Sequence, residues 1–191
     1  IKIVLFIVIA PFLGMFISFF ILAFILFLAK KSSPAKIDKI FRKLQIVSAG
    51  AFSLGHGGND AQKTMGIIVA LLFANGYLDS IDQIPLWVIL SCYSVIALGT
   101  LSGGWRIIKT VGYNITPLKP PSGACAEFGA SFALFAANSL GIPLSTTHVL
   151  TGSVVGVSSY NAETLQKTNW SLLKRIGIAW IITFPCAALF S

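Results

Sequence analysis

Charged residues are scarce in this sequence. Only 10% of its 191 residues are Asp, Glu, Lys or Arg, whereas about one quarter of a soluble domain is charged because its surface must meet water. Apolar residues make up 55% of the chain, and several apolar runs reach the roughly 20 residues that cross a bilayer core of about 30 Å. The composition therefore excludes an ordinary soluble domain and predicts an integral membrane protein in a lipid bilayer.

Cysteine and histidine are also rare. The three cysteines, Cys92, Cys125 and Cys186, are odd in number and show no CxxC spacing. This pattern excludes a disulfide framework and a zinc site, and predicts buried free thiols. The two histidines, His56 and His148, lack an HxxxH spacing. We therefore expect them to be hydrogen-bonded framework side chains and not metal ligands.

Lys and Arg outnumber Asp and Glu by 14 to 6, but the excess lies in loops between the apolar runs. No basic helix typical of nucleic-acid binding is present, so we predict no nucleic-acid partner. Basic loops of membrane proteins face the cytoplasm. We therefore predict a multi-pass protein of the cell membrane (plasma or inner), with loops 30–43, 103–120 and 158–175 on the cytoplasmic side. The loop 75–83, which has two aspartates and no basic residue, should lie outside.

The apolar runs predict an all-α fold with about four membrane-crossing helices. We expect spans at 3–29, 44–74, 85–101 and 170–190, with a separate short helix at 36–43. The span at 44–74 should be broken at 55–59. Its sequence there contains three glycines in four positions (GHGG), each of which costs about 1 kcal/mol in a helix interior. Asn59 would then cap a helix that resumes at Asp60.

The segment 122–157 is predicted to be a re-entrant helical hairpin. Its arms, 122–140 and 145–157, are joined by Gly141-Ile142-Pro143. The second arm is about 20 Å long at 1.5 Å per residue, too short for a full crossing. Such a hairpin is stable only where protein or a wet cavity covers its non-helical backbone.

Two polar stretches, residues 55–63 and the tip of the hairpin, interrupt the apolar sequence and carry the candidate functional side chains. An aspartate inside a membrane is by default functional, although a flexible kink lined by polar residues would also explain residues 55–63. At the hairpin tip, Ser145 or Thr146 can cap the second arm, and a hydroxyl-rich helix N-terminus is a ready anion site. The alternative there is an ordinary helix whose hydroxyls bond its own carbonyls. A pair of interrupted helices favours a transport site.

Two further charged residues lie in or near these stretches in sequence. Glu127 is a second carboxylate within an apolar arm, and could pair with Lys63, bind a cation or carry a proton. Lys63 follows Asp60 by three residues and shares its helix face. Either a local ion pair or a direct contact with an anion would explain it.

Three segments resemble the PiT family of inorganic phosphate transporters, namely GHGGNDAQKTMGIIV (55–69), PLKPPSGACAEFGAS (117–131) and PLSTTHVLTGSVVG (143–156). They are similar to the second of that family's two inverted repeats. The resemblance implies a secondary transporter, not an enzyme, that moves phosphate by symport with Na⁺ or H⁺ and has no other cofactor. Only one Asn-Asp motif is present, and the chain begins at Ile1. We therefore expect residues 1–191 to be one transmembrane domain, half of an inverted-repeat transporter. The first repeat would lie on the same or a separate chain, and the protein could form a homodimer.

The resemblance also implies which residues form the site. Phosphate would bind at Asn59, Asp60, Gln62, Ser145, Thr146 and Thr147, and the coupling cation or proton at Asp60, Glu127 and Asn59. A carboxylate about 4 Å from phosphate repels it by several kcal/mol in a dry site, unless the carboxylates hold the coupling ion; beyond a possible Na⁺ we expect no metal. Two alternatives remain: a permease for sulfate or another oxyanion, and a membrane-embedded phosphate-ester hydrolase using His148 or a hydroxyl beside Asp60. No sequence motif sets a nucleophile beside a base, which argues against the hydrolase.

Overall fold

The computed structural model describes residues 2–190, and every regular element within that range is a helix. The helices are α1 Lys2–Leu28, α2 Pro34–Ala74, α3 Leu86–Gly103, α4 Trp105–Lys109, α5 Pro120–Ser139, α6 Thr146–Ser159, α7 Ala162–Gln166 and α8 Trp170–Leu189. A 3₁₀ turn, Ala29–Lys31, follows α1, and a π-helical turn, Thr110–Asn114, follows α4. The expected all-α fold is confirmed, with α4 and α7 as short additions in segments that were expected to be loops.

Three of the described helices are long and apolar enough to cross a membrane. They cover Leu5–Lys31, Leu86–Gly103 and Trp170–Leu189, close to three of the expected spans. The fourth expected span lies in α2, whose 41 residues extend about 60 Å at 1.5 Å per residue. Helix α2 is long enough for a crossing. It is not one of the three sufficiently apolar helices, because its middle carries the polar residues of the GHGGNDAQK segment.

The break predicted at 55–59 is wrong. Helix α2 runs without interruption through Gly57, and the expected separate helix at 36–43 is its first part. The reason is tertiary packing. Gly55 and Asn59 are buried, and a Cβ at Gly55 would lie 3.3 Å from Leu134 of α5. Packing of this kind contributes more to helix stability than intrinsic propensity does, and here it outweighs the cost of the glycines.

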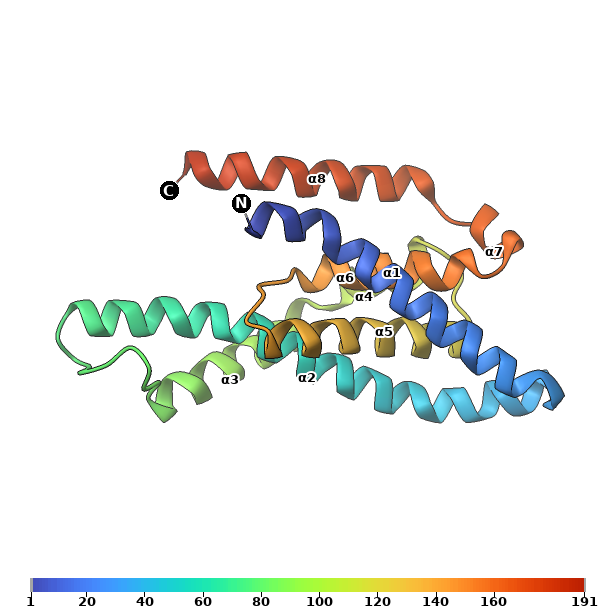
Figure 1. The fold of residues 1–191 in the computed structure, drawn as a ribbon, viewed down its shortest axis with the longest axis horizontal. Helices are drawn as coiled ribbons and strands as arrows, with labels where there is room; N and C mark the ends of the chain where they lie inside the picture. Colours follow the sequence, from blue (N-terminus) through green and yellow to red (C-terminus); the bar gives the residue numbers. More distant parts are fainter. Residues whose placement is uncertain (1, 191) are drawn as a thin grey trace.

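Helices α5 and α6 form a helical hairpin, with arms within two residues of the predicted bounds; its re-entry into the membrane stays a prediction. Gly141 makes the turn at a positive φ of 64°, a conformation that favours glycine. Helix α6 has 14 residues, about 21 Å. Ten of them are buried, so the protein covers the short arm on most sides (Figure 1).

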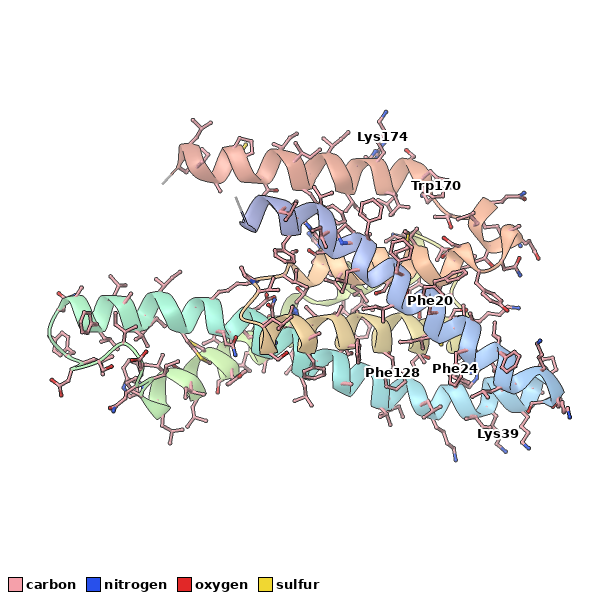
Figure 2. All side chains as sticks on the ribbon, in the orientation of Figure 1. Phe20, Phe24, Lys39, Phe128, Trp170 and Lys174 are labelled. Atoms are coloured by element: carbon pink, nitrogen blue, oxygen red, sulfur yellow. The ribbon has the colours of Figure 1, made fainter. Side chains whose placement is uncertain are left out.

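Helix α1 separates its two faces by side-chain size and not by polarity. Its buried face carries Ala10, Gly14, Ser18 and Leu22 at four-residue intervals. Phenylalanines at 12, 16, 20, 24 and 27 are all more than half exposed, and Figure 2 labels Phe20 and Phe24 among them. The small face lies against the hairpin, which leaves the aromatic face for lipid or for a further part of the protein.

The contact between α1 and α6 is a close approach of two backbones. Gly152 and Gly156 of α6 leave room for the carbonyl oxygens of Pro11 and Met15, which would lie only 1.9 and 2.2 Å from an added Cβ. Small residues four apart are typical of tightly packed membrane helices. The Ser18 hydroxyl also donates to the carbonyl of Ser153 at 2.8 Å. The hairpin is therefore fixed to α1 by shape as well as by a hydrogen bond.

The remaining helices lie outside this centre. Helix α3 packs on the distal half of α2 through Val88 and Cys92, and the loop joining them lies at the opposite end of the molecule from α7 and the α1–α2 junction (Figure 1). Helix α8 runs along one side, and none of the residues of its candidate span whose side chains are described is buried. Cys92 and Cys125 are buried free thiols as expected, but Cys186 is exposed because it lies on α8.

Candidate functional site

The loop between α5 and α6 meets the middle of α2 (Figure 1). The Leu144 side chain is 3% exposed and packs in the apolar cluster that also contains Ala130 and Val149. This contact anchors the loop while the Leu144 carbonyl accepts hydrogen bonds from α2. Asn59 donates to this oxygen at 2.8 Å and Lys63 donates to it at 3.0 Å. The hairpin tip is thus held by polar side chains from a single face of α2.

Asp60 lies at the centre of this contact. Its Oδ1 accepts hydrogen bonds from Lys63 at 3.1 Å and from Asn59 at 3.0 Å. Its Oδ2 accepts a hydrogen bond from the Thr146 hydroxyl at 3.3 Å. The His56 Nδ1 lies 3.2 Å from the same oxygen, close enough for an ion pair when the imidazole is protonated. Four side chains from two helices therefore surround one carboxylate.

The first turn of α6 contributes to the electrostatics of this cluster. Thr146 is the first residue of α6 and Ser145 is its N-cap, so the partial positive charge of the helix N-terminus lies beside Asp60. Together with Lys63 it stabilises the carboxylate. Ser145 holds the N-cap position of the second arm as expected, but its side chain makes no capping hydrogen bond to α6. Only this one helix N-terminus meets the cluster among the described residues, because α2 passes the site as a continuous helix.

The predicted phosphate ligands divide into two groups. Asp60 accepts hydrogen bonds from both Asn59 and Thr146. Ser145 and Thr147 lie beside them, with their hydroxyl oxygens 3.0 Å apart at the surface. Gln62 is exposed and, two residues from Asp60 on α2, does not face the cluster.

Glu127 lies in a different place. It accepts a hydrogen bond at 2.5 Å from the hydroxyl of Ser48, which is fully buried on α2. Ser48 and Asp60 are separated by about 18 Å along α2 at 1.5 Å per residue. The pairing of Glu127 with Lys63 is therefore wrong, since Lys63 bonds to Asp60 and Leu144. The two carboxylates do not share one cluster.

The two histidines make different contacts. His56 stacks on Phe52 with ring centroids 5.9 Å apart. The His148 ring lies against Trp180 of α8 in a tilted arrangement, with ring centroids 3.8 Å apart, and its Nδ1 lies 3.3 Å from the Ile7 carbonyl oxygen. Within residues 2–190, no group of three His, Cys, Asp or Glu side chains is placed to hold a metal ion.

The Asp60 cluster lies on an exposed face of this chain. The side chains of Asp60 and Lys63 are 34% and 46% exposed. The cavity of about 180 Å³ between α1, α6 and α8 is lined by other residues, among them Phe12, Val155 and Trp180. A ligand at Asp60 would therefore need a further protein surface to enclose it.

Sequence reasoning missed two components of these sites. The Leu144 carbonyl is a backbone group in a loop and has no signature in the sequence. Ser48, the partner of Glu127, lies 79 residues away from it, and a lone serine in an apolar helix gives no signal either. By contrast, a local ion pair between Asp60 and Lys63 was one of the two interpretations of Lys63, because the spacing i, i+3 places both on one helix face.

Comparison with known proteins gives consistent matches. The profile of the Phosphate transporter family matches residues 28–191. A "Probable low-affinity inorganic phosphate transporter" of Rhizobium meliloti (strain 1021) is 50% identical over 97% of this chain and 55% of its own length. The protein of the same name from Bacillus subtilis (strain 168) is 38% identical over 98% and 56%. A "Sodium-dependent phosphate transporter 2" of Xenopus tropicalis is 34% identical over 85% and 25%. The chain thus spans about half the length of the curated bacterial relatives named here. No solved structure matches it.

Proposed function

Because the chain belongs to the phosphate transporter family, we propose that it is one half of a secondary transporter that carries inorganic phosphate across the cell membrane by symport with Na⁺ or H⁺. The family and the names of the relatives indicate a transporter and not an enzyme. One structural observation carries the proposal. The N-terminus of α6 meets Asp60 through the Thr146 hydroxyl, with the Lys63 ammonium alongside.

Phosphate would bind at the start of α6. A helix N-terminus offers free N–H groups and a partial positive charge, which suit an oxyanion. The hydroxyls of Ser145 and Thr147 bond to each other and can turn to an incoming phosphate oxygen without leaving a buried group unpaired. Asn59 and Thr146 would complete this side of the site. Gln62 joins them only if the other half of the transporter covers the exposed side of α2.

The coupling cation would compensate for the charge of the substrate. The Asp60 carboxylate and a phosphate dianion about 4 Å apart repel each other by several kcal/mol in a dry site. A positive charge must therefore accompany the anion. Asp60 with Asn59 forms one candidate position for a cation or proton, and Glu127 forms a second. The sodium-dependent name of the frog relative supports Na⁺ as one candidate for this chain, alongside H⁺.

The rest of the transporter would close the open face. The curated bacterial relatives are nearly twice as long as the matched segment, which supports a first repeat that packs against α2 and α8. That repeat would lie on the same or a separate chain, and a homodimer of complete transporters is a further level of assembly. The hairpin α5–α6 would re-enter from the side of the basic loops 30–43, 103–120 and 158–175, which we assign to the cytoplasm.

Uptake of radiolabelled phosphate into proteoliposomes that contain the complete transporter tests this proposal. We expect Asp60→Asn to lower ion-coupled uptake by about 10-fold to 100-fold, since hydrogen bonds to a charged group contribute about 1.5–3 kcal/mol. Asp79→Asn is the matched control, because Asp79 lies in the exposed α2–α3 loop, and should leave uptake unchanged. Unchanged uptake by the Asp60 variant would remove Asp60 from the mechanism. Strong competition by sulfate would instead favour a broader oxyanion permease.

A further inference from the structure

We propose that Lys63 is a tethered cation that takes the place of a bound alkali cation at Asp60. The inference deepens the proposed function, on which it rests, because it assigns the counter-charge at one of the two carboxylates. It makes Lys63 a residue that determines ion specificity. The position beside Asp60 is thereby closed to Na⁺ for as long as the lysine is in place.

The surroundings of the Lys63 ammonium support this inference. Its Nζ lies 3.1 Å from Asp60 Oδ1 and 3.0 Å from the Leu144 carbonyl oxygen. A carboxylate oxygen and a backbone carbonyl oxygen are ligand types that hard cations take in proteins. The Thr146 hydroxyl donates to the other carboxylate oxygen of Asp60, so it could supply a third oxygen ligand to a cation. The lysine therefore occupies a position that offers a free cation an oxygen-rich set of ligands.

The position of Lys63 in the chain makes it a strong competitor for this set. It follows Asp60 by three residues on the same continuous helix, so its ammonium is always within reach. A tethered group acts at an effective concentration of the order of millimolar or higher, and a free cation must displace it. The charge is also already balanced. One ammonium faces one carboxylate, and His56 is the other group that could add positive charge there.

Glu127 provides the contrast within the same molecule. The side-chain partner of its carboxylate in the described residues is the neutral hydroxyl of Ser48, and the ion pairs found between residues 2 and 190 do not include Glu127. The two carboxylates thus differ in one respect that matters for coupling. Asp60 carries its own cation, whereas Glu127 remains open to a mobile one.

The test measures sodium binding directly, through the thermal unfolding midpoint of the purified complete transporter in NaCl and in choline chloride at equal ionic strength. A ligand that binds the folded state raises this midpoint. We expect Lys63→Ala to gain a sodium response whose half-maximal concentration is at least about tenfold lower than that of any response in the unchanged protein. Lys63→Arg keeps the charge and should behave like the unchanged protein. Lys109→Ala, which removes an exposed lysine of α4, is the control.

The double variant Asp60→Asn with Lys63→Ala identifies the site of any gain, because it removes the carboxylate as well and should return the sodium response to that of the unchanged protein. Equal sodium responses in Lys63→Ala and the unchanged protein would overturn the inference, and so would a gain that persists in the double variant. If Lys63→Ala does not fold, Lys63→Gln serves in its place. Phosphate uptake by the unchanged transporter is measured separately. Its absence would refute the proposed function without altering the result of the sodium titration.

Discussion

Replacing Gly152 by alanine should destabilise the protein more than a single methyl group suggests. The added Cβ would lie 1.9 Å from the Pro11 carbonyl oxygen and 2.6 Å from the Pro11 Cα. Both are backbone atoms, so no side-chain rotation relieves the clash. The helices α1 and α6 must therefore move apart to make room for the methyl group.

That movement has two energetic consequences. Overpacking of a well-packed contact costs about 1–3 kcal/mol. The hydrogen bond from the Ser18 hydroxyl to the Ser153 carbonyl, 2.8 Å long, crosses the same contact and would be stretched or lost, at about 0.5–1.5 kcal/mol. We therefore expect Gly152→Ala to lower the free energy of unfolding by roughly 2–4 kcal/mol.

Reversible unfolding in mixed detergent micelles, followed by circular dichroism, measures this loss. The matched control is Gly177→Ala in α8, where an added Cβ meets no atom within 4 Å. There, alanine should stabilise the helix by up to about 1 kcal/mol because of its higher helix propensity. If Gly152→Ala unfolds with the same free energy as the unchanged protein, the close approach of α1 and α6 is refuted, and with it the reason for the position of the hairpin.

Two further predictions follow from polar contacts. Ser48→Ala removes the hydroxyl that donates to Glu127 and should lower the free energy of unfolding by about 1–3 kcal/mol. Ser48→Thr keeps a hydroxyl and should retain most of this stability. Equal losses in the two variants would contradict the hydrogen bond. The hydrogen bond from Lys167, and then its charge, holds the pKa of the exposed Glu163 below its ordinary value. A lowered carboxyl pKa favours the folded state above the unfolded pKa, and this contribution is lost as the pH falls through the folded pKa. Carboxyl chemical shifts during an acid titration should report this lowered pKa, and Lys167→Gln should return the pKa toward its ordinary value. An unchanged pKa in Lys167→Gln would show that the pair does not form.

Much of the fold follows from local sequence. The apolar runs that became α1, α3 and α8 were predictable because a bilayer demands about 20 apolar residues. The hairpin bounds were predictable as well, since Gly141 and Pro143 interrupt an otherwise apolar segment. The course of α2 was not, because its continuity depends on Gly55 and Asn59 being buried against distant residues.

For the site, the sequence by itself determined which residue types are present and that Asp60 and Lys63 share a face of α2, since helix periodicity alone requires it. Only the tertiary structure decided which groups meet. It brought Thr146 and the Leu144 carbonyl to the Asp60–Lys63 pair from residues 86 and 81 positions away in the chain, and it paired Glu127 with Ser48 on a different part of α2. The physical reason is that the close approach of α1 to the hairpin fixes where the tip lies. Such long-range packing depends on the shapes of several helices at once, which no local pattern encodes.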